Sequence, residues 1–400
     1  MADNKNNNER NVPHLRFPEF SGEWDSFKLV ELGKFIGGGT PSSSNLSFWT
    51  GSIPWISSSD IKEDNINNIS ISRYITEEAI EKSATKYCPA PVILIVSRVG
   101  VGKVALSHTS LCTSQDFCNI IEIKCHPVFL SYNLLRTMKR KSREVQGTSI
   151  KGITSDELQK MRVFIPKNKD EQNKISNLLT LLDERIATQN KIIEDLQSLI
   201  KGLIDDIITL ECGQLVTFET LYSKAGEGGT PTTSNTEFYD NGNIPFIKID
   251  DLNNKYLSTN KDYITELGLK KSSAWLIPAH SIIYSNGATI GAISINKYPV
   301  CTKQGILGIV PNTNIDVEFL YYFMQSSYFQ KEVERVVTEG TMKTAYLKDI
   351  NHIKCPIPDL DRQKEISHLL SVLSLKEDVE RQLLQKYQIQ KQYLLGQMFI

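Results

Sequence analysis

The sequence reads Gly38-Gly39-Thr40-Pro41-Ser42-Ser43-Ser44-Asn45, and 190 residues later it reads Gly228-Gly229-Thr230-Pro231-Thr232-Thr233-Ser234-Asn235. Further matches follow in the same order at offsets of 189 to 193, such as residues 53–56 with 244–247 and residues 112–115 with 301–304. Because order and spacing are both kept, the chain contains one unit twice, and each copy takes about half of the 400 residues. Such a unit is far longer than the roughly 20–50 residues of a solenoid repeat.

The composition fits a protein with folded cores. Lys and Arg number 45 and Asp and Glu number 46, and this balance excludes a polybasic chain or an acidic disordered one. No apolar run approaches the roughly 18–20 residues of a membrane helix, and the Asn-rich start lacks the apolar segment of a secretory signal. The seven cysteines are never spaced Cys-x-x-Cys, which disfavours a zinc ribbon or a disulfide framework. We therefore expect a cytoplasmic protein with several globular parts.

Each copy is expected to have two parts. The first part mixes turns with short apolar runs that read as strands, at residues 91–96, 119–123, 281–284 and 305–310. Helical patches lie at 128–145 and 317–337. The second part begins after Pro166 in the first copy and after Pro358 in the second, and it is a long helical pattern.

The two helical patterns have the spacing of a coiled coil, in which seam positions alternate by four and three residues. The first seam is Ile175, Leu179, Leu182, Ile186, Gln189, Ile193, Leu196, Ile200, Leu203 and Ile207. The second is Ile366, Leu370, Leu373, Glu377, Glu380, Leu384, Tyr387, Lys391, Leu394 and Met398. A helix from about residue 170 to 208 would be about 60 Å long and would need a partner in water.

The simplest partner of each long helix is the other one. We therefore predict an α/β fold with two similar globular domains separated by two long antiparallel coiled-coil helices, which gives the chain a pseudo-two-fold axis. The heptads do not fix the orientation, and a second arrangement, in which each helix folds back onto its own domain, stays open. The expected boundaries are 1–19 for an N-terminal tail, 20–168 and 212–358 for the domains, and 169–211 and 359–400 for the helices.

Two similar domains on a long spacer suit duplex DNA, because two readers can then lie about one helical turn apart. Residues 136–143 hold five positive charges and no acid, and such a cluster can neutralise phosphates or can simply be a solvated helix face. The candidate contacts from this region are Lys139, Arg140, Lys141, Arg143 and Lys151. The second copy is less basic here and offers Lys343.

The loops of the two copies offer further candidates. Ser42, Ser43, Thr232 and Thr233 can contact phosphates, although turn formation or helix capping is the commoner role of such residues. Residues 97–103 contain Arg98 and Lys103, and residues 285–291 are expected to be their counterpart. Arg98 suits guanine and Asn286 suits adenine, from the donor and acceptor pattern of the major groove. Lys303 is a further candidate from the second copy.

Catalytic motifs are largely missing from the sequence. Residues 35–39 resemble the methyl-donor loop of adenine methyltransferases, but the second motif of those enzymes does not occur. Gly102-Lys103 is followed by Val104, so a phosphate-binding P-loop is not supported. Neither the histidines nor the cysteines have the spacing of metal ligands. We expect no catalytic residue, no metal site and no cofactor in this chain.

The whole chain resembles the specificity subunits of type I restriction–modification enzymes. The resemblance rests on the entry Leu15-Arg16-Phe17-Pro18-Glu19-Phe20 with Gly22 and Trp24, on the two Gly-Gly-Thr-Pro loops, and on the domain ends. The domain ends are Gly147-Thr148, Ile165-Pro166 and Glu171-Gln172-x-x-Ile175, and then Gly340-Thr341, Ile357-Pro358 and Gln363-x-x-Ile366. The second copy departs from the Glu-Gln pattern by carrying Arg362-Gln363.

The resemblance implies a function. Each domain would be a target-recognition domain that reads one half of a bipartite DNA site, and the helices would set the gap between the halves. Two adenine methyltransferase subunits would bind and use S-adenosylmethionine, and two motor–nuclease subunits would use ATP and Mg²⁺. The chain itself would not be an enzyme. The alternatives are a stand-alone nuclease or methyltransferase, and a scaffold with two heads that does not bind DNA.

Overall fold

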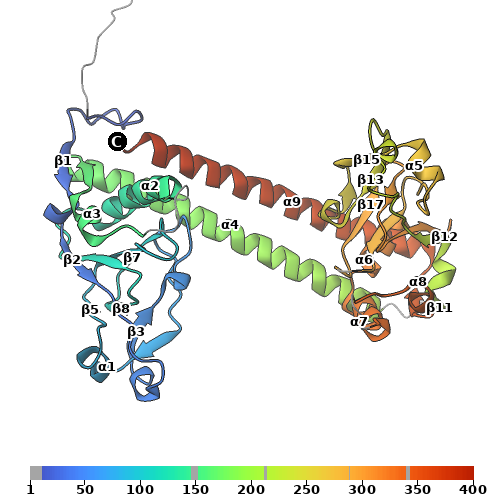
Figure 1. The fold of residues 1–400 in the computed structure, drawn as a ribbon, viewed down its shortest axis with the longest axis horizontal. Coiled ribbons are helices and arrows are strands. Elements are labelled where there is room, and N and C mark those ends of the chain that lie inside the picture. The colour runs from blue at the N-terminus through green and yellow to red at the C-terminus, as the bar shows by residue number, and fades with distance from the viewer. Residues whose placement is uncertain (1–10, 146–151, 211–213, 288, 339–342) are drawn as a thin grey trace, which may run out of the picture. The chain divides into compact units, whose positions relative to one another are not determined.

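The computed structural model describes residues 11–145, 152–210, 214–287, 289–338 and 343–400. The chain forms two compact units. The first unit is Met1–Asn190 with Leu383–Ile400, and the second unit is Lys191–Gln382. Each unit therefore contains one globular part and a stretch of both long helices (Figure 1).

The first unit is built in layers. A four-stranded sheet of order β2-β9-β6-β7 lies in the middle, a second sheet of order β4-β3-β8-β5 lies on one side of it, and helices lie on the other side (Figure 1). A two-stranded sheet pairs β1 with β10. The strands are β1 (Asp25–Lys28), β2 (Lys34–Gly37), β3 (Ile53–Ile56), β4 (Arg73–Ile75), β5 (Tyr87–Cys88), β6 (Val92–Ile95), β7 (Val104–Ser107), β8 (Leu111–Thr113), β9 (Cys118–Ile121) and β10 (Arg162–Ile165). The helices of the globular part are α1 (Glu77–Glu81), α2 (Pro127–Val145) and α3 (Ser155–Lys160).

The layers explain why β6 is apolar at every position. Successive side chains of a strand point to opposite faces. Ile93 and Ile95 face the core under α2, and Val92 and Leu94 face the core shared with the second sheet. A strand that is buried on both faces reads as a continuous apolar run.

The second unit repeats this plan. Its sheets have the orders β12-β19-β16-β17-β14, β15-β13-β18 and β11-β20. The strands are β11 (Gln214–Thr217), β12 (Tyr222–Glu227), β13 (Ile244–Ile247), β14 (Tyr256–Leu257), β15 (Asp262–Ile264), β16 (Ile282–Ser285), β17 (Ile293–Asn296), β18 (Cys301–Thr302), β19 (Ile306–Pro311) and β20 (Lys354–Ile357). Its short helices are α5 (Glu266–Lys270), α6 (Val317–Phe323), α7 (Ser327–Val336) and α8 (Leu347–Ile350).

One helical prediction for the second unit is wrong in detail. The stretch 317–337 was expected to be one helical patch, but it is two helices, α6 and α7. Ser326 separates them, because its hydroxyl accepts a hydrogen bond from the amide of Phe329 and so caps the start of α7. A side-chain cap of this kind satisfies a backbone donor that the preceding turn would otherwise have paired.

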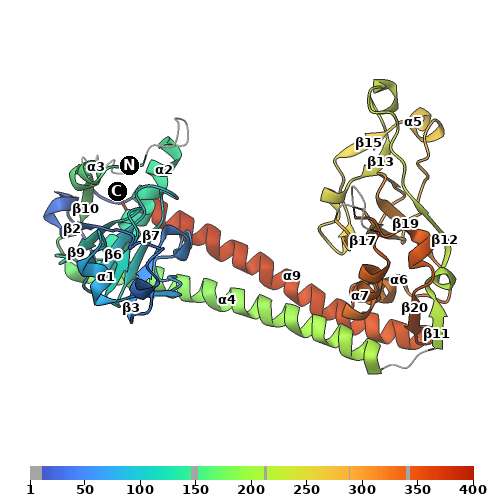
Figure 2. The ribbon, with the colours of Figure 1, turned by 60° about the horizontal axis from the view of Figure 1, so that its bottom comes forward.

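Two long helices follow the globular parts in sequence, as predicted. They are α4 (Lys169–Leu210) and α9 (Leu360–Gln397). In the first unit Asp183 bonds Lys391 and Arg185 lies 3.4 Å from the hydroxyl of Tyr387, and in the second unit Gln197 donates to Glu377. Because the residue number rises along one helix as its partner falls along the other, α4 and α9 pair antiparallel within each unit (Figure 2).

Every seam position of both helices is buried or half-buried. Both helices also reach into the globular cores. Ile175 and Leu179 of α4 and Met398 near the end of α9 belong to the main core of the first unit. Ile204 of α4 and Ile366 of α9 belong to the main core of the second unit. Each core is therefore completed by both helices, so the arrangement in which each helix packs only on its own globular part does not occur.

No helix in the described part of the chain is long and apolar enough to cross a membrane.

Candidate functional site

Backbone hydrogen bonds fix which loop residues of the two units correspond. The amide of Ser97 donates to the carbonyl of Asp116 at 2.8 Å, and the amide of Asn286 donates to that of Gly305 at 3.1 Å. Val96 bonds Lys103 in the same way as Ser285 bonds Ala292. The counterpart of Ser97 is therefore Asn286, and the counterpart of Arg98 is Gly287. The expected match of Arg98 with Asn286 is wrong by one residue.

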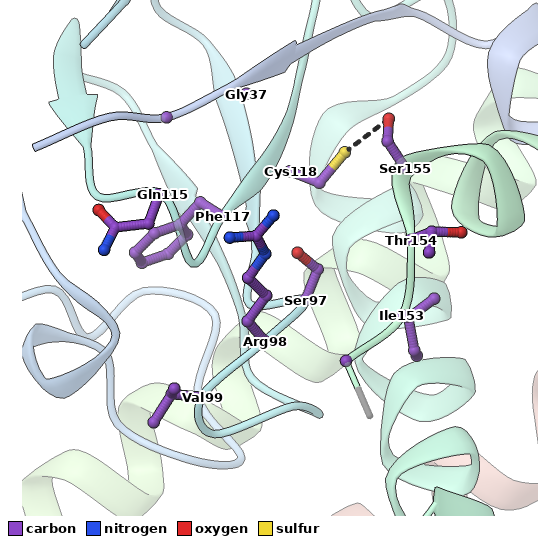
Figure 3. A pocket seen from close by; sticks show the side chains of 12 residues that line it. Gly37, Ser97, Arg98, Val99, Gln115, Phe117, Cys118, Ile153, Thr154 and Ser155 are labelled. Atoms are coloured by element: carbon purple, nitrogen blue, oxygen red, sulfur yellow. Dashed lines mark hydrogen bonds between the residues drawn. The ribbon is translucent and has the colours of Figure 1, made fainter. Parts of the chain in front are cut away.

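Arg98 lies in a pocket of the first unit with a volume of about 710 Å³. The pocket is lined by residues 37–38, 97–99, 115, 117–118 and 152–155. Figure 3 shows the guanidinium in the middle of the pocket, with Gln115 and Phe117 on one side and Thr154 and Ser155 on the other. Arg98 is exposed, and no hydrogen bond or ion pair to another described residue holds it. Its five N–H donors are thus free to meet a ligand.

Two backbone features shape this pocket. The amide of Ile153 donates to the carbonyl of Ser97 at 2.7 Å, so the segment before α3 is tied to the Arg98 loop. Gly152 is needed at this crossing, since a Cβ there would lie 2.6 Å from the oxygen of Ser97. The loop that carries Arg98 is therefore held by the main chain while its side chain stays exposed.

The repeated Gly-Gly-Thr-Pro segments mainly hold loops together. A Cβ on Gly38 would lie 2.0 Å from the carbonyl oxygen of Ser114, and a Cβ on Gly228 would lie 2.2 Å from that of Thr302. The hydroxyl of Thr40 donates to Gln115 on the facing loop. The four hydroxyl residues predicted as DNA contacts are exposed beside these turns: Ser42, Ser43, Thr232 and Thr233.

The basic residues of α2 divide into two groups. Lys139 pairs with Asp64 at 2.8 Å, and Arg136 donates to the carbonyl of Ile400 at 2.6 Å. Arg140 and Arg143 are exposed, and Lys141 is half-buried. The structure thus gives Lys139 a partner within the fold and leaves Arg140 and Arg143 on the surface.

The remaining candidate cations are scattered. Lys103 is half-buried, and its ammonium donates to the carbonyl of Ser58 at 3.1 Å. Lys303 and Lys343 are exposed in the second unit, and Lys151 lies outside the described residues. The structure therefore brings Arg98 and Gln115 together in one pocket, but it does not gather all the predicted cations into one patch.

Asn286 does not suit the base-reading role that was predicted for it. Its side chain is 1% exposed, and its amide nitrogen donates to the carbonyl of Ala345 at 3.1 Å. The amide of Ala345 in turn donates to the carbonyl of Asn286 at 2.9 Å. The Oδ1 of this side chain has no hydrogen-bond partner among the described residues, but it is buried, so a base cannot reach it.

The sequence analysis missed one exposed residue that lies next to the Asn286–Ala345 bonds. Tyr346 is 45% exposed and directly follows Ala345. It precedes α8 as Thr154 precedes α3, and both residues are the N-caps of those helices. The sequence held a signal, because counting twelve residues back from Pro166 and from Pro358 reaches Thr154 and Tyr346.

The described residues hold no group of three or more His, Cys, Asp or Glu side chains that could bind a metal ion. The cysteines among the described residues also lack a reactive setting. Burial raises the pKa of Cys88 to about 11 and the pKa of Cys125 to about 12, which keeps both thiols protonated at neutral pH.

Comparison with known proteins agrees with the presence of two similar units. The family profile described as "Type I restriction modification DNA specificity domain" matches residues 21–198 and 221–387. The type I restriction enzyme MjaIX specificity subunit of Methanocaldococcus jannaschii is 27% identical over 365 residues, which are 84% of this chain and 83% of the relative.

Two solved structures share the fold. The S subunit of a type I restriction–modification system from M. genitalium has a TM-score of 0.58 and 17% identity, and the match covers 97% of this chain and 99% of that one. A chain from a structure concerned with complex assembly and conformational transition of the type I R-M system has a TM-score of 0.62 and 15% identity, with 93% and 96% covered.

Proposed function

The chain belongs to the family of type I restriction–modification DNA specificity domains, and on that premise we propose that it reads a bipartite DNA site, one half with each of its two recognition domains. The first domain is residues 20–168 and the second is residues 212–358. The chain is a specificity subunit and not a catalytic one. Its proposed place of action is the cytoplasm, where the DNA of its host lies.

The observation that carries the proposal is a shared scaffold with different side chains at one backbone position. The first domain places Arg98 in an open pocket, and the second domain has Gly287 at the corresponding position. Two readers of different half-sites need this combination of a constant frame and variable side chains. An arginine with free donors suits the O6 and N7 acceptors of guanine in the major groove.

Exposed cations near the loops provide the sequence-independent part of binding. Arg140 and Arg143 on α2 and Lys303 and Lys343 in the second domain are exposed, and each can approach a phosphate. Lys141 and Lys151 are included in the proposed set from the first domain. Lys139 can join only by exchanging its bond to Asp64 for one to a phosphate. Phosphate contacts position a protein on DNA without reading its sequence.

The helices are proposed as the spacer that sets the gap between half-sites. They are 42 and 38 residues long, and the longer one spans about 63 Å at about 1.5 Å per residue. The ends of both helices are anchored in folded cores, through Leu179 and Met398 in the first unit and Ile204 and Leu370 in the second. Such anchoring resists sliding of one helix along the other, because a slip would pull apolar side chains out of both cores.

The proposed partners are two adenine methyltransferase subunits and two motor–nuclease subunits. S-adenosylmethionine, ATP and Mg²⁺ would be bound by those partners. The solvent side of α9 supports docking of a partner helix, because Leu369, Val372 and Val379 are 49%, 52% and 51% exposed at spacings of three and seven residues. Apolar residues at such spacings lie on one helical face and fit the apolar seam of another helix.

The test is to co-express the chain with the adenine methyltransferase subunit of its own system and to map methylated adenines in the host DNA. A single split motif, with modified adenine in each half and a fixed gap, is expected. The control is the methyltransferase without this chain, which should produce no motif. Methylation that persists without the chain, or a stable complex that produces no motif, would refute the proposal.

A further inference from the structure

A tyrosine follows the point where the second domain crosses the loop that corresponds to the Arg98 loop of the first domain. Gly287 corresponds to Arg98 and supplies no side chain of its own. The segment that crosses this loop is attached in the same way in both units, by Ile153 to Ser97 in the first and by Ala345 to Asn286 in the second. The next residue is Thr154 in the first unit, which lines the Arg98 pocket, and Tyr346 in the second.

Helix capping does not account for a tyrosine at position 346. Thr154 caps α3, since its hydroxyl accepts from the amide of Glu157 at 3.2 Å and donates to the Glu157 carboxylate at 2.8 Å. Tyr346 occupies the same cap position of α8 and makes no side-chain cap bond. The side chain is 45% exposed, and a Ser, Thr, Asn or Asp would cap this helix start better.

The backbone under Tyr346 is firmly held. Asn286 is fully buried in the second domain and bonds Ala345 through both its side chain and its main chain. Asn286 thus acts as a positioning residue, and the Tyr346 ring is presented from a fixed point. The ammonium of Lys348 lies 5.5 Å from the centre of this ring, and Lys348 is also exposed.

We propose that Tyr346 is the base-contacting residue of the second domain and that its ring meets the 5-methyl group of a thymine in the major groove. This inference rests on the proposed function and adds the chemistry of the second half-site to it. Apolar side chains recognise thymine through that methyl group, which no other DNA base carries at this place. The ring lacks the paired donors that recognise guanine, and neighbouring Lys348 can contact a phosphate beside the same base pair.

The first experiment changes only the DNA. The complex of this chain with its methyltransferase is bound to a duplex carrying the mapped motif, and each thymine of the second half-site is replaced in turn by deoxyuridine, which lacks the methyl group. We expect one replacement to weaken binding by about fivefold, which is the size expected for the loss of one buried methyl-sized group. The thymines of the first half-site serve as internal controls.

The second experiment changes the residue. Tyr346→Ala is expected to bind the thymine duplex about fivefold more weakly than the wild type does, and to bind the thymine and deoxyuridine duplexes equally. Tyr346→Phe keeps the ring and should keep the discrimination. The matched control is Tyr263→Ala, because Tyr263 is equally exposed in the same domain but its counterpart in the first domain is also a tyrosine, Tyr74. A residue shared by both domains cannot explain different half-sites.

The outcomes separate the two proposals. A wild-type complex that yields no split motif refutes the proposed function, and this inference falls with it. A split motif in which no deoxyuridine replacement in the second half-site weakens binding overturns the inference alone. Equal discrimination by Tyr346→Ala and wild type also overturns it. The deoxyuridine series needs no variant, so it can refute the inference even where Tyr346→Ala fails to fold.

Discussion

Lys391 of α9 and Asp183 of α4 form an ion pair inside the first unit, and removing the lysine is expected to destabilise that unit strongly. The two side chains are 5% and 3% exposed. The hydroxyl of Tyr132 donates to Asp183 at 2.8 Å, and Lys391 also donates to the carbonyl of Asp64. Burial raises the pKa of the Asp183 carboxyl, and Lys391 and Tyr132 oppose that rise. Asp183 therefore depends on these partners to remain charged.

The internal repeat supplies the matched substitutions. The seam position of Lys391 corresponds to Ile200 in α4, and Asp183 corresponds to Ser374 in α9. In the second unit the hydroxyls of Tyr322 and Ser374 lie 2.9 Å apart in place of the Tyr132–Asp183 contact, and the ammonium of Lys255 donates to the same Tyr322 hydroxyl at 3.1 Å. Lys391→Ile alone leaves the Asp183 carboxylate buried without its counter-charge. Loss of one partner from a buried pair costs about 3–5 kcal/mol, so we expect a loss of that size.

The double variant Asp183→Ser with Lys391→Ile should return to within about 1.5 kcal/mol of the wild type, because replacing both partners of a buried pair is often neutral. The assay is urea unfolding of the full chain followed by tryptophan fluorescence. Three of the four tryptophans, Trp24, Trp49 and Trp55, lie in the first unit, so the signal mainly reports that unit.

The loss of stability in Lys391→Ile should also depend on pH, in a direction that follows from the pKa of Asp183. In Lys391→Ile the folded-state pKa of Asp183 lies above its value of about 3.9 in the unfolded chain, since burial continues to raise it while Lys391 no longer opposes. The folded state then binds more protons than the unfolded state between these two values, so stability falls as pH rises through the folded pKa. Asp64, the other acid near Asp183, acts in the same direction. A cost below about 1 kcal/mol, or an equal cost at pH 5 and pH 8, would refute the reasoning.

Three further outcomes are expected. Arg98→Ala should relax one guanine position in the first half-site by about 1–3 kcal/mol in the methylation or binding profile, while the matched surface variant Arg162→Ala keeps the motif unchanged. Exchanging residues 20–165 for those of a homologue should alter one half-site in the mapped motif, and a change in both halves would contradict the two-domain reading. Inserting one heptad into α4 and one at the facing position of α9 lengthens the pair by about 10 Å and should widen the gap between half-sites or abolish binding, so an unchanged gap would disprove the spacer role.

The sequence alone determined the features that depend on local spacing. The seam of α4 could be predicted because the alternation of four and three residues follows from the geometry of a single helix. Two similar units followed from the repeat, because equal sequences in equal order fold alike. The apolar run at 91–96 indicated a strand, and β6 (Val92–Ile95) lies there, with both of its faces covered in the structure.

Contacts between segments far apart in the sequence decided which loop residues correspond and which polar groups are buried. The correspondence of Arg98 with Gly287 is set by backbone bonds to segments far along the chain. Because the sequence alignment of the two loops was one residue out, it predicted Asn286 as a base contact, although Asn286 is buried and bonds the backbone of Ala345. The position of Tyr346 is set by the same bonds between Asn286 and Ala345. The pairing of Asp183 with Lys391 joins residues 208 apart and needed the antiparallel contact of α4 and α9. The spacing of residues in sequence records which face of an element they share, but the partner that each face meets, and hence which polar groups are buried or free, is fixed only when distant segments pack together.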